Sequence, residues 1–221
     1  MNTTFTVMVA IVALGLVLTA CSRRKSDVPA ANPTDRHNQL FKEGLDLISP
    51  YMPIHGVEPK DASTGEAQEE IKTGIEKLTQ VVVLNPHNWA AYWVMGKAYQ
   101  ALRDSQNACE SFKASWGIHK ANADVAREYM IECLNLGRGA EGVTLAEQAL
   151  KLEPNQPGLV ANYALALLID GKVDSAEKEV QRALQLDGTD KVTKDLQRII
   201  GEVKSGKRPR PTKFGDLNGV K

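Results

Sequence analysis

Apolar side chains recur at the three- and four-residue spacing of a helix along several stretches of the chain. Between residues 37 and 49, Leu40, Phe41, Leu45 and Ile48 lie on one such stripe. Residues 191–203 show the same pattern, with charged side chains between the apolar positions. These stretches predict an all-α protein.

The helical stretches repeat with a period of 34 residues. Pro86 and Pro154 each follow an apolar helical stretch, and they stand 68 residues apart, which is twice 34. Gly137 and Gly171 keep the same period and mark predicted turns between helices. Small residues fall at equivalent positions of successive units, where two helices must approach closely. The columns of small residues are Ala108, Gly142 and Ala176, then Ser115, Ala149 and Ala183.

A unit of this length with these columns resembles the tetratricopeptide repeat, in which each unit is a pair of antiparallel helices. The resemblance covers about two thirds of the chain. It implies a short right-handed α-solenoid of helix-turn-helix repeats with a C-terminal capping helix. Residues 87–188 hold three repeats, at about 89–122, 123–156 and 157–190.

The segments on either side of these repeats depart from the period. Residues 36–86 predict a first helix pair interrupted by an inserted loop at about 50–68, and residues 191–204 predict the capping helix. The loop carries Tyr51, Met52 and Ile54 among prolines, which favours a docking role, although a loop of this length also fits a flexible connection. Residues 205–221 hold Pro, Gly and basic residues with few apolar groups, so we expect a disordered basic tail.

The first residues of the chain have the pattern of a signal peptide. Phe5–Ala20 is a run of 16 uncharged, mostly apolar residues, which as a helix is about 24 Å long and shorter than a bilayer core. The four residues from Leu18 to Cys21 resemble the bacterial lipoprotein cleavage box. That resemblance implies that residues 1–20 are removed and that Cys21 carries a diacylglyceryl group and further acyl chains such as palmitate. Residues 21–35 then form the lipidated Cys and a flexible spacer.

The predicted location follows from this signal. The lipoprotein resemblance implies anchoring in the bacterial cell envelope, facing the periplasm, and Ser22 after the lipidated residue is typical of the outer membrane. An alternative stays open, because Arg23, Arg24 and Lys25 follow the apolar run. By the positive-inside rule, that order favours an uncleaved anchor with the rest of the chain in the cytoplasm.

The resemblance also implies a binding groove, because the first helix of each tetratricopeptide repeat lines the concave surface. Its mixture of apolar, aromatic and polar residues suits an amphipathic helix or an extended peptide. Trp93 with Arg127 is the predicted energetic centre, since aromatic residues and Arg dominate interfaces; the alternative is that Trp93 packs in the core. The predicted groove residues are Phe41, Leu45, Trp93, Lys97, Gln100, Arg127, Ile131, Asn135, Asn162, Leu165 and Ile169.

Composition and candidate chemistry narrow the function further. The 27 basic side chains equal the 27 acidic ones, so no bulk charge indicates a nucleic acid partner. The four His residues are isolated from one another and from Cys at metal-ligand spacing, and phosphate-loop, hydrolase-elbow and metalloprotease motifs are missing. Cys109 and Cys133 fall on adjacent helices, where they are either buried apolar residues or a disulfide.

The sequence therefore predicts a protein that is not an enzyme and needs no metal, cofactor or small-molecule substrate. We expect a membrane-anchored scaffold that binds a protein or peptide during envelope complex assembly, of the pilus, secretion or outer-membrane biogenesis type. The alternatives are a cytoplasm-facing adaptor on an uncleaved N-terminal anchor, or an accessory protein that handles cell wall or ligand. Fold alone does not choose among them.

Overall fold

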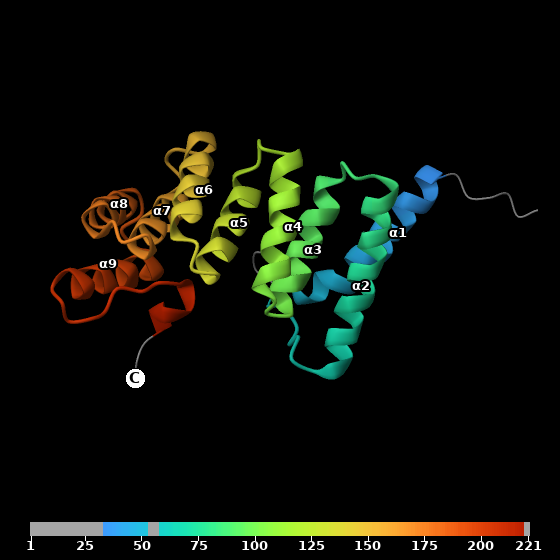
Figure 1. Cartoon of the computed structure of the whole chain (residues 1–221), viewed down its shortest axis with the longest axis horizontal. Coiled ribbons are helices and arrows are strands. Elements are labelled where there is room, and N and C mark those ends of the chain that lie inside the picture. Colours follow the sequence, from blue (N-terminus) through green and yellow to red (C-terminus); the bar gives the residue numbers. More distant parts are fainter. Residues whose placement is uncertain (1–32, 53–57, 219–221) are drawn as a thin grey trace, which may run out of the picture. The chain divides into compact units, whose positions relative to one another are not determined.

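The computed structural model describes residues 33–52 and 58–218. The predicted signal peptide, Cys21 and residues 22–32 of the spacer lie outside these ranges. Within them the chain forms helices and no strands, in agreement with the predicted fold class (Figure 1). The helices are α1 Pro33–Ile48, η1 Ser49–Tyr51, α2 Gly65–Leu84, α3 Trp89–Ala101, α4 Ser105–Ile118, α5 Ala123–Asn135, α6 Gly139–Leu152, α7 Pro157–Ile169, α8 Val173–Leu186, α9 Lys191–Lys204 and η2 Phe214–Asn218.

Consecutive helices pack in pairs, and each pair packs on the next. The pairs are α1 with α2, α3 with α4, α5 with α6, and α7 with α8, and α9 packs against α7 and α8. The first helices of neighbouring pairs also touch, α1 on α3 and α5 on α7. Described residues 33–52 and 58–218 therefore form a solenoid of helical repeats (Figure 1). We call the surface made by α1, α3, α5 and α7 the first-helix face.

Each of the three regular pairs turns at a residue in the left-handed backbone region, and these residues keep the 34-residue period. Arg103, Gly137 and Gly171 have φ values of 59°, 73° and 90°. At Gly137 the chain closes a Schellman cap, in which the Arg138 N–H donates to the Cys133 carbonyl at 2.8 Å. Glycine adopts this conformation freely, whereas Arg103 carries a strain of about 1 kcal/mol.

The columns of small residues lie between paired helices and away from water. Ala108, Ser115, Ala149, Ala176 and Ala183 are at most 1% exposed. Larger residues of the partner helix fill the space that the small ones leave. A Cβ added at Gly96 of α3 would lie 2.5 Å from the Phe112 ring of α4, and one at Gly142 of α6 would lie 2.5 Å from Leu134 of α5. Close helix packing thus explains these columns.

The connection within the first helix pair contributes residues to the core, whereas the sequence favoured a docking role for it. Tyr51 and Met52 are 7% and 5% exposed, and both belong to the hydrophobic cluster around α1 and α2. The Tyr51 hydroxyl donates to Glu70, and this bond raises the pKa of Tyr51 to about 12. Two of the three apolar residues that favoured docking are therefore core residues; Ile54 lies outside the described ranges.

The predicted spacer and the predicted loop each end earlier than expected. Residues 33–35, assigned to the spacer, already belong to α1, because Pro33 suits a first helical position and Asp35 a first turn. The helix α2 begins at Gly65, inside the predicted loop, where the Thr64 hydroxyl caps it by accepting from the Ala67 N–H.

The C-terminal residues depart furthest from expectation. Residues 205–218, predicted to be disordered, fold back after α9 and end in η2, which contacts α5 (Figure 1). Phe214 and Leu217 pack against the hydrophobic cluster of the repeats, and Pro211 is buried. We call residues 207–218 the C-terminal segment.

Candidate binding groove

The first-helix face divides into a polar part between α3 and α5 and an apolar part between α5, α7 and α9. Of the predicted groove residues, four line an apolar cavity: Arg127, Ile131, Asn162 and Leu165. Gln100 and Asn135 line a second, polar hollow. Phe41, Leu45, Trp93, Lys97 and Ile169 line neither.

The side chains of several predicted groove residues pack against the hydrophobic core. Phe41 and Leu45 pack against the cluster around α1 and α2, while Trp93 packs against both hydrophobic clusters of the molecule. Ile169 is only 3% exposed. The packing of Trp93 favours the core alternative over its predicted role as the energetic centre.

Lys97, another predicted groove residue, is buried in an ion pair and is not exposed to a partner. Its ammonium lies 3.3 Å from the Glu128 carboxylate, and the two side chains are 7% and 12% exposed. Gln100 donates to Glu128 at 3.0 Å and to Glu132 at 2.8 Å, and the Asn135 amide donates to Glu132 at 3.0 Å. Such hydrogen bonds offset the cost of removing charges from water.

Glu128 is the centre of this polar network. Burial raises the pKa of its carboxyl, but the nearby Lys97 ammonium, the Gln100 amide and the Arg127 guanidinium outweigh burial. The pKa of Glu128 is therefore lower than its ordinary value of 4.5. The network satisfies its own charges, so the part of the face between α3 and α5 offers few free groups to a partner.

The apolar part of the face contains a cavity of about 450 Å³. It is a size that accommodates several side chains of a peptide, or a small molecule. Asp190 and Asp195 lie beside its apolar lining, and Arg127 and Asn162 contribute polar groups. The apolar lining comes from Ile131, Ala161, Leu165, Leu196 and Ile199, and from Phe214 and Leu217 of the C-terminal segment.

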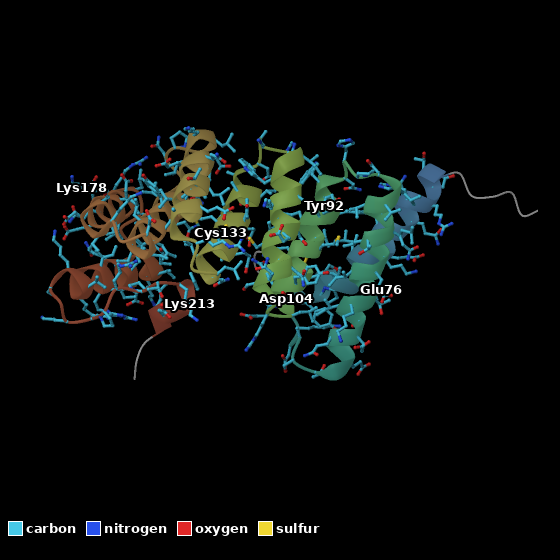
Figure 2. All side chains as sticks on the ribbon, viewed as in Figure 1. Glu76, Tyr92, Asp104, Cys133, Lys178 and Lys213 are labelled. Atoms are coloured by element: carbon cyan, nitrogen blue, oxygen red, sulfur yellow. The ribbon has the colours of Figure 1, made fainter. Side chains whose placement is uncertain are left out.

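Two arginines order the C-terminal segment: Arg208 bonds within it, and Arg210 attaches it to the end of α7. The Arg208 guanidinium donates to the carbonyls of Asp216 and Leu217 at 2.9 and 2.6 Å. Arg210 donates to the Ile169 carbonyl at the end of α7, where a cation also offsets the helix dipole. The segment then passes the end of α5, and Figure 2 shows Lys213 at this place, where it lines the polar hollow with Asn135.

Asp216 fixes the turn that precedes η2. Its carboxylate accepts the Thr212 N–H and hydroxyl, both at 2.9 Å, and the Lys213 N–H at 3.2 Å. The bond from the Thr212 N–H is the largest cause that keeps the pKa of Asp216 below its ordinary value. This local turn places Phe214 and Leu217 on the groove. This arrangement was not predicted, because the composition of residues 205–221 indicated a disordered tail.

The buried thiols of Cys109 and Cys133 lie together between α4 and α5, and both are free. The hydrogen bond between them lowers the pKa of Cys109 and raises that of Cys133. The Arg138 guanidinium lies 3.6 Å from the Cys109 sulfur. Figure 2 marks Cys133 on α5, and its burial agrees with a role as a small core residue.

Two kinds of feature are missing from the described ranges. Residues 33–52 and 58–218 contain no group of three or more His, Cys, Asp or Glu side chains placed to hold a metal ion. In the same part of the chain, no helix combines the length and the apolar character needed to cross a bilayer.

Comparison with known proteins supports the architecture. No protein-family model matches the chain. Human Tetratricopeptide repeat protein 16 is 24% identical over 143 residues, which cover 59% of this chain and only 16% of that protein.

Two solved structures are similar. MamA residues 41 to the end, from Desulfovibrio magneticus RS-1, give a TM-score of 0.57 at 15% identity, covering 78% of this chain and 93% of that one. YrrB, described as a TPR protein with an unusual peptide-binding site, gives a TM-score of 0.57 at 14% identity, covering 81% of this chain and 87% of that one. At these identities the similarity concerns the fold alone. The fold of the described residues is that of a tetratricopeptide-repeat-like solenoid.

Proposed function

We propose that this protein is an adaptor that binds another polypeptide in the apolar cavity between α5, α7 and α9. The observation that carries the proposal is that cavity of about 450 Å³, where an apolar lining is combined with Arg127, Asn162 and two Asp side chains. Such a mixture supports anchoring by apolar side chains and orientation by polar ones. A fold relative, YrrB, is described as having a peptide-binding site.

Crosslinking in intact cells tests the groove. A photoreactive amino acid replaces Asn162, which lines the cavity, in the full-length chain. The matched control carries the same amino acid at Lys113, an exposed position on α4. We expect one or a few polypeptides to be crosslinked from position 162 and to be missing from position 113. Identical products from both positions would show that the groove does not select a partner.

We further propose that the adaptor is tethered to the bacterial envelope through Cys21 and serves the assembly of an envelope complex. The support is the sequence alone: the apolar run Phe5–Ala20 ends in the four residues Leu18–Cys21 that resemble the lipoprotein cleavage box. Radiolabelled palmitate should label the wild-type chain and not Cys21→Ala. A wild-type chain that is associated with the membrane but takes up no label would favour the uncleaved anchor that Arg23, Arg24 and Lys25 suggest.

A further inference from the structure

We propose that the C-terminal segment is a built-in ligand of the groove, and that the partner is a basic peptide carrying an aromatic residue followed, three positions later, by an aliphatic one. The inference rests on the proposed function, because it names the chemistry of the polypeptide that the groove binds. It also makes the segment a competitor that the partner must displace.

The first observation is the way in which the segment occupies the groove. Phe214 and Leu217 stand three residues apart on η2, so one turn presents both side chains to the same side. Both line the cavity together with Ile131, Leu165 and Leu196 of three different helices. The chain therefore shows which side-chain pattern fits this surface.

The second observation is charge. The segment is basic, with Lys207, Arg208, Arg210 and Lys213 ahead of or beside its aromatic residue. Asp190 and Asp195 line the cavity beside Arg127, and Glu132 lines the hollow with Arg103 and Lys213. These carboxylates already have partners, because Asp190 caps α9, Asp195 pairs with Arg198, and Glu132 accepts from Gln100 and Asn135. Arg210 binds the carbonyl end of α7. A basic residue four positions before the aromatic one, in the place of Arg210, is therefore expected in the partner too.

The third observation is that the segment fills the groove incompletely. A cavity of about 450 Å³ remains between its two apolar side chains and the helices, and Phe214 and Leu217 are only half-buried. Most of the segment's remaining residues are exposed. A peptide with larger or additional apolar side chains would fill that space, so it can replace the segment even though the segment, being tethered, has a high effective concentration.

The test uses a fluorescent peptide with the sequence of residues 207–218, KRPRPTKFGDLN, as the probe. Its binding to the full-length chain is followed by fluorescence anisotropy at physiological salt. Wild type is compared with Phe214→Ala/Leu217→Ala, which removes both apolar side chains of the internal ligand and changes no residue of α1 to α9. We expect the double variant to bind the probe about tenfold more tightly, the factor for a groove that is free one tenth of the time. A probe with serine in place of Phe and Leu should not bind.

Arg208→Ala provides a second variant, because it removes the two bonds to the carbonyls of Asp216 and Leu217 but leaves both apolar side chains. It should also bind the probe more tightly than wild type, by a smaller factor. Equal binding by wild type and by both variants, with circular dichroism unchanged, would overturn the proposal. So would self-association of wild type that the double variant loses, because the occupant would then be the segment of a second copy.

The two proposals fail separately. If crosslinking from position 162 finds a partner whose affinity does not change in Phe214→Ala/Leu217→Ala, the groove is a binding site and the built-in ligand is wrong. If the double variant binds the probe tightly while no polypeptide is crosslinked in cells, the segment docks as described and the adaptor function is wrong.

Discussion

The two parts of the first-helix face differ in whether their side chains remain available to a partner. Between α3 and α5, Lys97, Glu128 and Glu132 are charged, and they are satisfied by one another and by neighbouring amides. Between α5, α7 and α9, apolar side chains line a cavity that the repeats themselves do not close, and the C-terminal segment partly covers it. The polar part holds neighbouring repeats together, whereas the apolar part retains capacity to bind. Position in the repeat therefore does not by itself make a residue a binding residue.

The largest expected effect is on the polar part. Lys97→Met leaves the Glu128 carboxylate buried with fewer partners, and we expect the free energy of unfolding to fall by about 3 kcal/mol, measured by urea titration. Adding Glu128→Leu should restore most of the loss. The matched control is Arg198→Met, which removes an exposed ion pair with Glu202 and should leave stability unchanged. Equal losses in both single variants would mean that the network is not structural.

A pH series sharpens the role of Glu128. Its folded-state pKa lies below the ordinary 4.5, so its charge stabilises the fold above that pH, and the contribution is lost as pH falls toward the lower, folded-state pKa. Wild type should therefore be more stable than Glu128→Gln at pH 7, and the difference should shrink as the pH falls below the ordinary pKa of 4.5. Thermal denaturation at several pH values measures the difference. A stability difference that does not change with pH would show that the charge of Glu128 does not stabilise the fold.

The apolar part should respond in binding more than in stability. Ala161→Leu places three further carbons in the cavity, and we expect the affinity for the 207–218 peptide to fall about tenfold, or about 1.4 kcal/mol, in the Phe214→Ala/Leu217→Ala background. Ala140→Leu, on the exposed start of α6, is the matched control and should bind as the background does. Unchanged affinity in Ala161→Leu would place the peptide elsewhere.

The smallest expected effect concerns the turn residues. Arg103 has a φ of 59° where the other two regular pairs have glycine. Arg103→Gly should raise the free energy of unfolding by about 0.5 kcal/mol, because relief of strain is partly offset by the greater freedom of glycine in the unfolded chain. Arg103→Ala keeps the strain and should give no gain. A more stable alanine variant would show that the arginine side chain, and not its backbone, matters.

The regular repeats were predictable because their signal is local and repeated. The period seen in Pro86 and Pro154 places α3 to α8 inside the three predicted units, and Gly137 and Gly171 indeed end the first helices. Four of the predicted groove residues line the cavity, because equivalent positions of each repeat place their side chains on the same face of the first helix.

What the sequence did not reveal depends on contacts between distant residues. Tyr51 and Met52 are core residues because α2 covers them, and the C-terminal segment is ordered because Phe214 and Leu217 meet an apolar surface made by three helices. One feature of the sequence could have indicated the burial of Lys97: the opposite charge of Glu128 follows 31 residues later, three residues short of the period.

Helix α3 is the joint between the two hydrophobic clusters, because Trp93 and Tyr99 pack against both of them. In linear arrays each unit is coupled only to its neighbours, so stretches can melt one after another. Two large aromatic side chains shared at one boundary make separation of the irregular first pair from the repeats costly. We therefore expect unfolding to be cooperative across that boundary, and a pull on the amino-terminal end of α1 to be carried into the repeats instead of being absorbed by loss of the first pair.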